Sequence, residues 1–421
     1  MMKSTPHSSG SNRRALLCRT NFWLEPFSSS LAVTAPEIMN SRTQTKASFT
    51  SERLYFLDWL RILAFMALVL YHVGMYYVSW DFHVKSPFAG PDLVPWMKLS
   101  EPWRMSLLFM ISGAVTAKLL KNGISQKFVR QRSARLLLPL LCGVLFIIPP
   151  QSYFEVIQKF QYAGSYVEFL RLYYTGYDGF CDKGSCLILP TWNHLWFLPY
   201  LWLYTMLACT ATALRPATLA QASRLAERAF RGWGLLLIPI SWLFILRLTL
   251  FERYPSTHAL WGDGLNHGVY LTMFFIGAGF AASHTLWDRS ARLRWPALCL
   301  AVCFWAVLVF IRPVMPYSHA VIAILQWCAL IAAFGFAKTH LNRDSWLRAH
   351  LSEAVFPVYV LHQTIIIVMS QVLLPLGLRP AIEGPFLIIC TFALSYVGYK
   401  LVRRIGFLRP WFGLKASQQS L

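Results

Sequence analysis

The chain alternates long apolar runs with short polar connections. Ten apolar runs follow one another between residues 55 and 402. About 20 apolar residues in a helix cross the hydrocarbon core of a bilayer. The runs are approximately 55–78, 103–120, 135–153, 194–214, 233–251, 265–284, 295–312, 319–338, 354–375 and 382–402. This pattern predicts an all-α polytopic membrane protein with about ten transmembrane helices.

Several runs contain proline, and the flanking segments differ in composition. Kinks are predicted at the prolines in or near the runs, which are Pro139, Pro149, Pro199, Pro239 and Pro357. Residues 1–52 are polar and rich in Ser and Thr. We interpret 1–52 as a disordered cytoplasmic tail, 53–405 as the transmembrane domain and 406–421 as a short cytoplasmic tail.

Composition and charge support a membrane protein and give an orientation. Of the 421 residues 56% are hydrophobic and 14% are charged, and the net charge is +21. No nucleic-acid-binding motif surrounds the basic residues, which sit between apolar runs. One alternate set of connections holds 21 Lys and Arg and the other holds nine. The positive-inside rule therefore predicts that both termini are cytoplasmic.

The first run, "LYFLDWLRILAFMALVLYHVGMYYVSW" (54–80), carries Asp58, Arg61 and His72. Asp58 and Arg61 are three residues apart and share a helical face. His72 projects the same way as Arg61, about 16 Å further along the axis. Such residues face the bundle interior or a wet cavity. One interpretation is a structural Asp58–Arg61 ion pair, with His72 hydrogen-bonded in the core. The other is a site where Arg61 holds an anion and His72 accepts a proton.

Five stretches in this order resemble the membrane-bound acyltransferase-3 family. They are "FLDWLR" with a histidine eleven residues after its arginine, "PWRMSLLFMISG" (102–113), "FVRQRSARLLLPLL" (128–141), "NHLWFLPYLWLY" (193–204) and "VYVLHQ" (358–363). The resemblance covers residues 53–405. Within the family, the chain is most similar to the subgroup that adds succinyl groups to osmoregulated periplasmic glucans.

The resemblance implies a multi-pass O-acyltransferase of the bacterial inner membrane. The donor substrate would be cytoplasmic acyl-CoA, either succinyl-CoA or acetyl-CoA, with no permanently bound cofactor and no metal. The acceptor would be a hydroxyl of a periplasmic glycan, with osmoregulated periplasmic glucan expected first. His72 would be the catalytic histidine, with Asp58 grouped beside it, and Arg61 would contact coenzyme A.

Four arginines outside the first run have two interpretations each. Arg104 begins the second run at the outer side and would orient an acyl carboxylate or extend to the interface. Arg130, Arg132 and Arg135 enter the third run from the cytoplasm. They would bind the phosphates of coenzyme A, or only set orientation and contact anionic lipid.

The remaining polar positions are assigned to the substrate site or to packing. His194 and Trp196 open the fourth run and would contact substrate or anchor the interface. His362 falls near mid-membrane, and we expect it on the cavity wall. Ser112–Gly113 would let two helices approach closely, or would pass a thioester arm.

A transporter is the alternative class of function. Ten spans with a buried Asp–Arg–His stripe also suit a proton-coupled carrier of a glycan or small anion, but no inverted repeat is evident. The sequence has no P-loop, HExxH or GxSxG motif. Cys181 and Cys186 would form a disulfide if their loop faces an oxidising compartment. Oligomeric state is open.

Overall fold

The computed structural model describes residues 53–121, 123–182 and 185–415. The expected disordered tail, 1–52, lies outside the described residues. Seven elements here are long and apolar enough to cross a membrane by themselves. Their helices are α1 (Tyr55–Tyr77), α2 (Val94–Leu120), α6 (Phe197–Leu214), α11 (Arg294–Ala306), α12 (Tyr317–His340), α13 (Trp346–Leu373) and α14 (Pro380–Arg404). A one-turn helix, Asn193–Trp196, precedes α6, a π-turn, Val307–Ile311, follows α11, and a short turn, Leu374–Leu376, follows α13.

Three further apolar elements are bent pairs of helices. They are α3 (Gln126–Cys142) with α4 (Pro149–Phe160), α7 (Thr218–Ala229) with α8 (Gly234–Leu250), and α9 (Gly264–Phe280) with α10 (His284–Arg292). The bends are 46°, 105° and 109°. If each pair counts as one span, the described part of the chain has up to ten candidate spans. The predicted helical fold with many candidate membrane spans is therefore confirmed, and the count of about ten agrees with the upper value.

The short elements lie outside the ten candidate spans. They are α5 (Tyr166–Thr175), α15 (Leu408–Trp411) and a hairpin of β1 (Cys181–Asp182) with β2 (Ser185–Cys186). A disulfide joins Cys181 to Cys186. After α14 the chain turns back, and Phe412 and Leu414 are buried in the main core. Part of the expected C-terminal tail thus packs on the domain.

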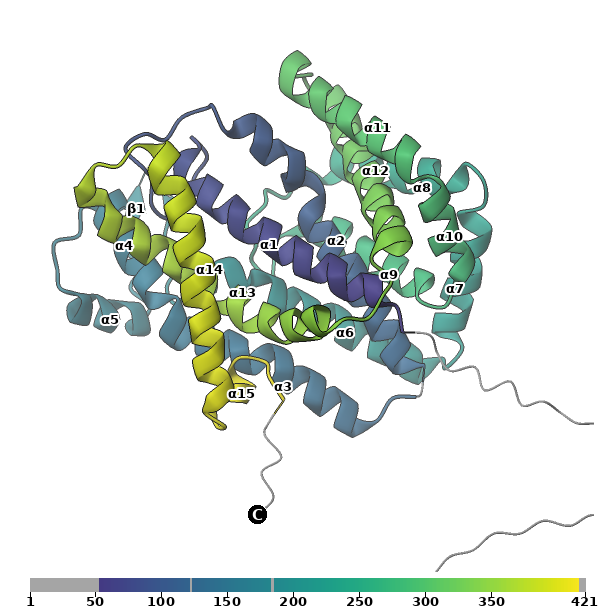
Figure 1. Ribbon diagram of the computed structural model, residues 1–421, viewed down its shortest axis with the longest axis horizontal. Helices are drawn as coiled ribbons and strands as arrows, with labels where there is room; N and C mark the ends of the chain where they lie inside the picture. Colours follow the sequence, from purple (N-terminus) through teal and green to yellow (C-terminus); the bar gives the residue numbers. More distant parts are fainter. Residues whose placement is uncertain (1–52, 122, 183–184, 416–421) are drawn as a thin grey trace, which may run out of the picture. The chain divides into compact units, whose positions relative to one another are not determined.

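The helix α1 runs through the middle of the domain (Figure 1). It packs against α2, α12, α13 and α14, which come from distant parts of the sequence. Pro149 and Pro150 follow a π-turn, Gly143–Ile147, and this is where α4 turns away from α3. Proline has no N–H to donate and often marks such a break. The kink predicted at Pro149 is confirmed, and it brings α4 against α13.

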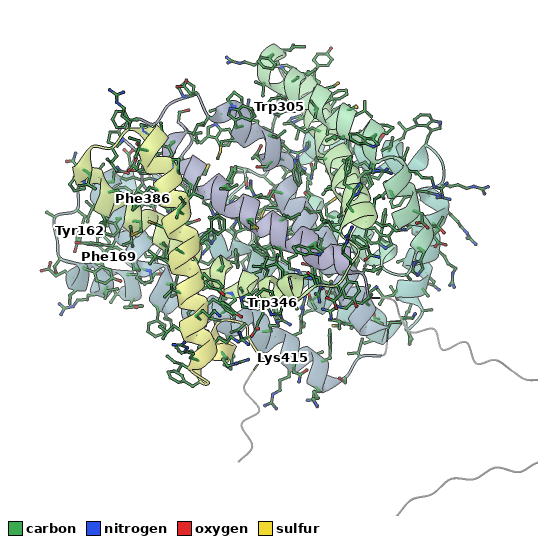
Figure 2. The ribbon with its side chains drawn as sticks, viewed as in Figure 1. Tyr162, Phe169, Trp305, Trp346, Phe386 and Lys415 are labelled. Carbon is green, nitrogen blue, oxygen red and sulfur yellow. A yellow bond between two sulfur atoms is a disulfide. The ribbon has the colours of Figure 1, made fainter. Side chains whose placement is uncertain are left out.

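The two ends of the helical domain differ in their residues. The basic end holds the starts of α1, α3 and α13 and the end of α14. The loop end, at the other end of α1, holds the segments 78–93, 161–182 and 185–192. At the loop end Tyr162 and Phe169 belong to an aromatic cluster with Phe180, beside α4 and α5 (Figure 2).

Candidate functional site

A cluster of three histidines from three separate elements lies inside the helical domain. We call His72, His194 and His362 the histidine cluster. His72 Nδ1 on α1 is 2.8 Å from His362 Nε2 on α13, and the two rings are stacked with centroids 5.0 Å apart. The His194 ring meets the His362 ring edge-on at 5.1 Å. His362 is fully buried, whereas His72 keeps part of its surface exposed.

The hydrogen bonds determine which nitrogen of each ring carries a proton. His362 Nδ1 lies 2.7 Å from the carbonyl oxygen of Tyr359. A carbonyl oxygen only accepts, so His362 Nδ1 is protonated and, in the neutral ring, His362 Nε2 is an acceptor. His72 Nδ1 must then donate to His362 Nε2. The neutral His72 ring therefore keeps a lone pair on Nε2, and the described residues offer that nitrogen no hydrogen bond.

His194 is held on both sides by protein groups. Its Nε2 donates to the carbonyl oxygen of Val360 at 3.2 Å, and its Nδ1 accepts from Gln151 Nε2 at 3.5 Å. Gln151 Oε1 accepts in turn from Asn193 and Gln363, each at 3.1 Å. With both ring nitrogens bonded, His194 fastens the start of the fourth span to α13 beside His362.

The connection after α1 covers the loop side of His72. The Phe82 ring is stacked with the His72 ring at a centroid distance of 6.2 Å. The next residue, His83, places Nδ1 2.5 Å from Glu155 Oε2 on α4. Sequence reasoning missed this pair. The signal for it was a carboxylate, Glu155, among the apolar residues directly after the third apolar run, because a carboxylate that becomes buried needs a partner.

Lys85 fastens the same connection to the end of α1. Its Nζ donates to the carbonyl oxygens of Met75 and Val78, both at 2.6 Å. These groups are at the carboxyl end of a helix, where a cation is favoured. Burial nevertheless lowers the pKa of Lys85 to about 8, since removing water penalises the ammonium form.

Arg104 approaches the cluster from α2. It is 5% exposed, and its guanidinium carbon lies 3.6 Å from the centroid of the Tyr71 ring, next to His72 in the sequence. One nitrogen donates to Ser100 Oγ at 3.2 Å, and Nε has no partner within the described residues. Glu101 interacts with Arg104 electrostatically but forms no ion pair with it in this part of the chain.

Trp196 lies in an aromatic group beside the histidine cluster. Its ring centroid is 4.4 Å from that of His258 and 5.5 Å from that of Tyr270. Trp192, four residues earlier, donates to the carbonyl oxygen of His258 at 3.1 Å. These contacts attach the start of the fourth span to the connection before α9.

At the basic end, three of the four predicted donor-side arginines come together. Arg61, Arg132 and Arg135 interact electrostatically with one another. Arg132 and Arg135 are three residues apart and share a face of α3. Arg130 is exposed and lies about 140° around α3 from Arg135. The structure does not bring Arg130 into this group.

Asp58 has a closer partner than Arg61. Its carboxylate lies 3.9 Å from Arg61 but 2.7 Å from Arg348 at the start of α13. Arg348 is 2% exposed and also binds Asp344 at 2.7 Å, which holds the pKa of Asp344 below its usual value. Asp58 precedes His72 by about 21 Å of helix. The structure thus separates Asp58 from His72 and joins α1 to α13 through it.

A small hollow of about 190 Å³ lies at the basic end. Arg135 lines it together with Arg409 and Lys415 from the segment after α14. Glu353 on α13 is within 4.0 Å of both Arg403 and Arg409. The hollow is therefore cationic with one acidic wall.

Comparisons with known proteins identify the family of the chain. The family model described as "Acyltransferase domain", of the acyltransferase-3 family, matches residues 54–400. Glucans biosynthesis protein C of Escherichia coli O81 (strain ED1a) is 24% identical over 350 residues. The protein of the same name from Escherichia coli (strain K12) is 23% identical over 346 residues. Each alignment covers 77% of this chain and 85% of the relative.

No solved structure matches the chain. The family match covers most of the chain, including α1 and the elements that carry the histidine cluster. The family supports acyl transfer, and the apolar helices support a polytopic membrane protein. The chain belongs to the acyltransferase-3 family of membrane proteins.

Proposed function

We propose that this chain is an O-acyltransferase of the bacterial inner membrane. It takes an acyl group from cytoplasmic acyl-CoA and transfers it to a hydroxyl of a periplasmic glycan. The relatives named glucans biosynthesis protein C make a glucan the first acceptor to test. In this orientation the basic end and both termini are cytoplasmic, and the loop end is periplasmic.

The observation that carries this proposal is the hydrogen-bond order of the histidine cluster. The Tyr359 carbonyl directs the proton of His362, and His362 directs the proton of His72. His72 Nε2 is left as an unprotonated, partly exposed imidazole nitrogen. Such a nitrogen can accept the proton of an alcohol that attacks a carbonyl carbon.

The reaction needs no further reactant. His72 Nε2 takes the proton of the acceptor hydroxyl while its oxygen bonds to the thioester carbon. The carbon–sulfur bond then breaks, and the proton passes from His72 to the departing thiolate. The products are an ester and free coenzyme A, and His72 returns to its starting form. His362 accepts the hydrogen bond of His72 Nδ1 throughout and stabilises the imidazolium.

The donor is expected at the basic end. Arg61, Arg132 and Arg135 provide charge for phosphate groups, and guanidinium groups bind phosphate well. Arg61 and His72 lie on α1 about 16 Å apart along the axis. The extended arm of coenzyme A would bridge that distance, with the thioester at His72.

Arg104 would select the acyl group. A buried guanidinium that forms no ion pair with the described residues favours an acyl chain that ends in a carboxylate. Succinyl-CoA meets this description and acetyl-CoA does not. The first of these donors is therefore the preferred one in this proposal.

The test is coenzyme A release by the purified full chain, with succinyl-CoA or acetyl-CoA and a glucan acceptor. The informative variant is His72→Asn, because the Asn amide takes the place of Nδ1 and can still donate to His362. It lacks the outer part of the ring, which carries Nε2. We expect turnover to fall about 100-fold or more.

His350→Asn is the control, since His350 is a histidine at the basic end whose ring bonds to Tyr396. It should keep wild-type turnover. Full turnover by a folded His72→Asn protein would contradict the assignment of the base. Glycan or anion flux through proteoliposomes without any acyl donor, and without coenzyme A release, would support the transporter instead.

A further inference from the structure

Two polar residues on one face of α4 bond to histidines near the site. Gln151 and Glu155 are four residues apart, so they lie on the same face about 6 Å apart along the axis. Gln151 bonds to His194, and Glu155 bonds to His83. His83 is therefore expected about one helical turn nearer the loop end than the histidine cluster.

Glu155 determines the state of the His83 ring. It is 5% exposed, and its two oxygens accept from different groups. Oε1 accepts from Lys159 Nζ at 2.9 Å, and Oε2 accepts from His83 Nδ1 at 2.5 Å. Lys159 also contacts the exposed Asp81 at 2.9 Å. His83 Nδ1 thus carries its proton, and the lone pair of the neutral ring is on Nε2.

His83 lies close to His72 and opens to the loop end. The Phe82 ring contacts both imidazoles, with centroid distances of 6.2 Å to His72 and 5.1 Å to His83. His83 also interacts electrostatically with His72 and with His194. Its side chain is 19% exposed. Nothing within the described residues bonds to its Nε2.

We propose that His83 contacts the acceptor, forming at Nε2 a hydrogen bond with a second hydroxyl group of a polyhydroxylated molecule whose reacting hydroxyl is at His72. The inference rests on the proposed function. The ligand class is a carbohydrate, because it needs two hydroxyl groups with a short separation. No covalent bond forms or breaks at His83 in this role.

The opposing explanation is that His83 only fastens the connection 78–93 to α4. The variant His83→Asn separates the two roles. Its amide nitrogen can replace Nδ1 as donor to Glu155, so the fastening is retained, while the Nε2 position is empty. We expect the KM for a glucan acceptor to rise about tenfold, as for a lost hydrogen bond to a bound hydroxyl. The kcat and the KM for the acyl donor should change less than about twofold.

Two further variants complete the comparison. His83→Gln places an amide near the Nε2 position and should recover part of the acceptor KM. Asp81→Asn removes an exposed partner of Lys159 without touching His83, and it should keep the wild-type acceptor KM. An unchanged acceptor KM in His83→Asn would overturn the inference and leave only the fastening role.

Binding without the donor separates this inference from the proposed function. Titration of a short glucose oligosaccharide into the purified full chain, followed by calorimetry, measures acceptor affinity directly. His83→Asn should weaken the affinity about tenfold, and His72→Asn should weaken it less. Wild-type binding without coenzyme A release would contradict the proposed function while supporting the acceptor site. Equal affinity of wild type and His83→Asn would overturn the acceptor site alone.

Discussion

At the scale of single residues, the direction of one proton decides what His72 can do. His362 must present an acceptor at Nε2 if His72 Nε2 is to stay unprotonated. His362→Phe removes that acceptor, and we expect kcat for coenzyme A release to fall about 10- to 100-fold with little change in KM. His362→Gln puts an amide oxygen near the same position and should recover most of the rate.

Those two variants should unfold at similar temperatures, so that the comparison reports on the proton and not on folding. A His362→Phe protein with wild-type kcat would show that the hydrogen bond to His72 has no part in catalysis.

Arg104 gives a second prediction at this scale. Arg104→Gln removes the buried positive charge and keeps polar atoms that can bond to Ser100. We expect kcat/KM for succinyl-CoA to fall about 10- to 100-fold, because the terminal carboxylate loses its partner. The value for acetyl-CoA should change little. Equal losses with both donors would mean that Arg104 serves packing on Tyr71 instead.

The sequence identified many residues of the candidate site but not the contacts between them. His72, His194 and His362 could be chosen because ionisable groups are costly in apolar helices. Their mutual contacts depend on how α1, α13 and the start of the fourth span pack. The partner of Asp58 shows the limit. Arg61 was predictable from its spacing of three residues, whereas Arg348 is 290 positions away in the chain and no local rule reaches it.

At the scale of elements, α2 and α9 approach closely at glycines. A Cβ on Gly113 would lie 1.8 Å from the carbonyl oxygen of Phe274, and one on Gly277 would lie 2.0 Å from that of Met110. The packing role predicted for Ser112–Gly113 is confirmed at Gly113. Gly277→Ala should destabilise the fold by about 1–3 kcal/mol through overpacking, seen as a lower thermal midpoint in detergent.

Gly90→Ala is the matched control for that measurement. No atom lies within 4 Å of a Cβ at Gly90, so its thermal midpoint should equal that of the wild type. A Gly277→Ala protein as stable as Gly90→Ala would mean that α2 and α9 can separate freely.

The titration of Lys85, at the end of α1, makes the stability of the fold depend on pH. Its pKa is lowered to about 8 in the folded protein from an ordinary value of 10.5. The unfolded chain therefore binds the proton more tightly, and stability from this group rises with pH between about 8 and 10.5. Lys85→Met lacks this titration. The difference in stability between wild type and Lys85→Met should grow in favour of the wild type across that window, measured by thermal unfolding in detergent at several pH values. A constant difference would contradict the lowered pKa.

The sequence predicts the bend before α4 but not its angle or its direction. Pro149 predicts a break, because proline cannot donate the helical hydrogen bond. The angle of 46° and the direction of α4 depend on its contacts with α13 and α5. The bonds from Gln151 to His194 and from Glu155 to His83 follow from that direction, so they could not be predicted from the proline alone.

At the scale of the whole helical domain, apolar character did not reveal which helices are central. The apolar windows of α2 and α12 are 72% buried, whereas that of α11 is 22% buried and that of α14 is 28% buried. All four sequences suit a membrane, because lipid tails accept apolar side chains as readily as a protein core does. Only the packed arrangement separates the most buried helices from those at the rim.

The orientation of the domain in the membrane is the prediction that concerns the domain as a whole. A single cysteine introduced as Arg130→Cys in a background lacking the native cysteines should react with a membrane-impermeant maleimide only after the cells are permeabilised. A single cysteine retained at Cys181 in that background should react in intact cells whose outer membrane is permeable. The disulfide with Cys186 agrees with an oxidising compartment on that side. The reverse labelling pattern would invert the proposed direction of acyl transfer.

The carbonyl of Tyr359 has a consequence for how this site could change over time. The direction of the hydrogen bonds in the His72–His362 pair is set by the main-chain carbonyl oxygen of residue 359. Every amino acid supplies such an oxygen at that position. Replacing the Tyr359 side chain can disturb its bond to the His194 carbonyl without reversing the two rings. The direction of these hydrogen bonds is therefore expected to survive substitution of Tyr359 and to be lost only when His72 or His362 is replaced.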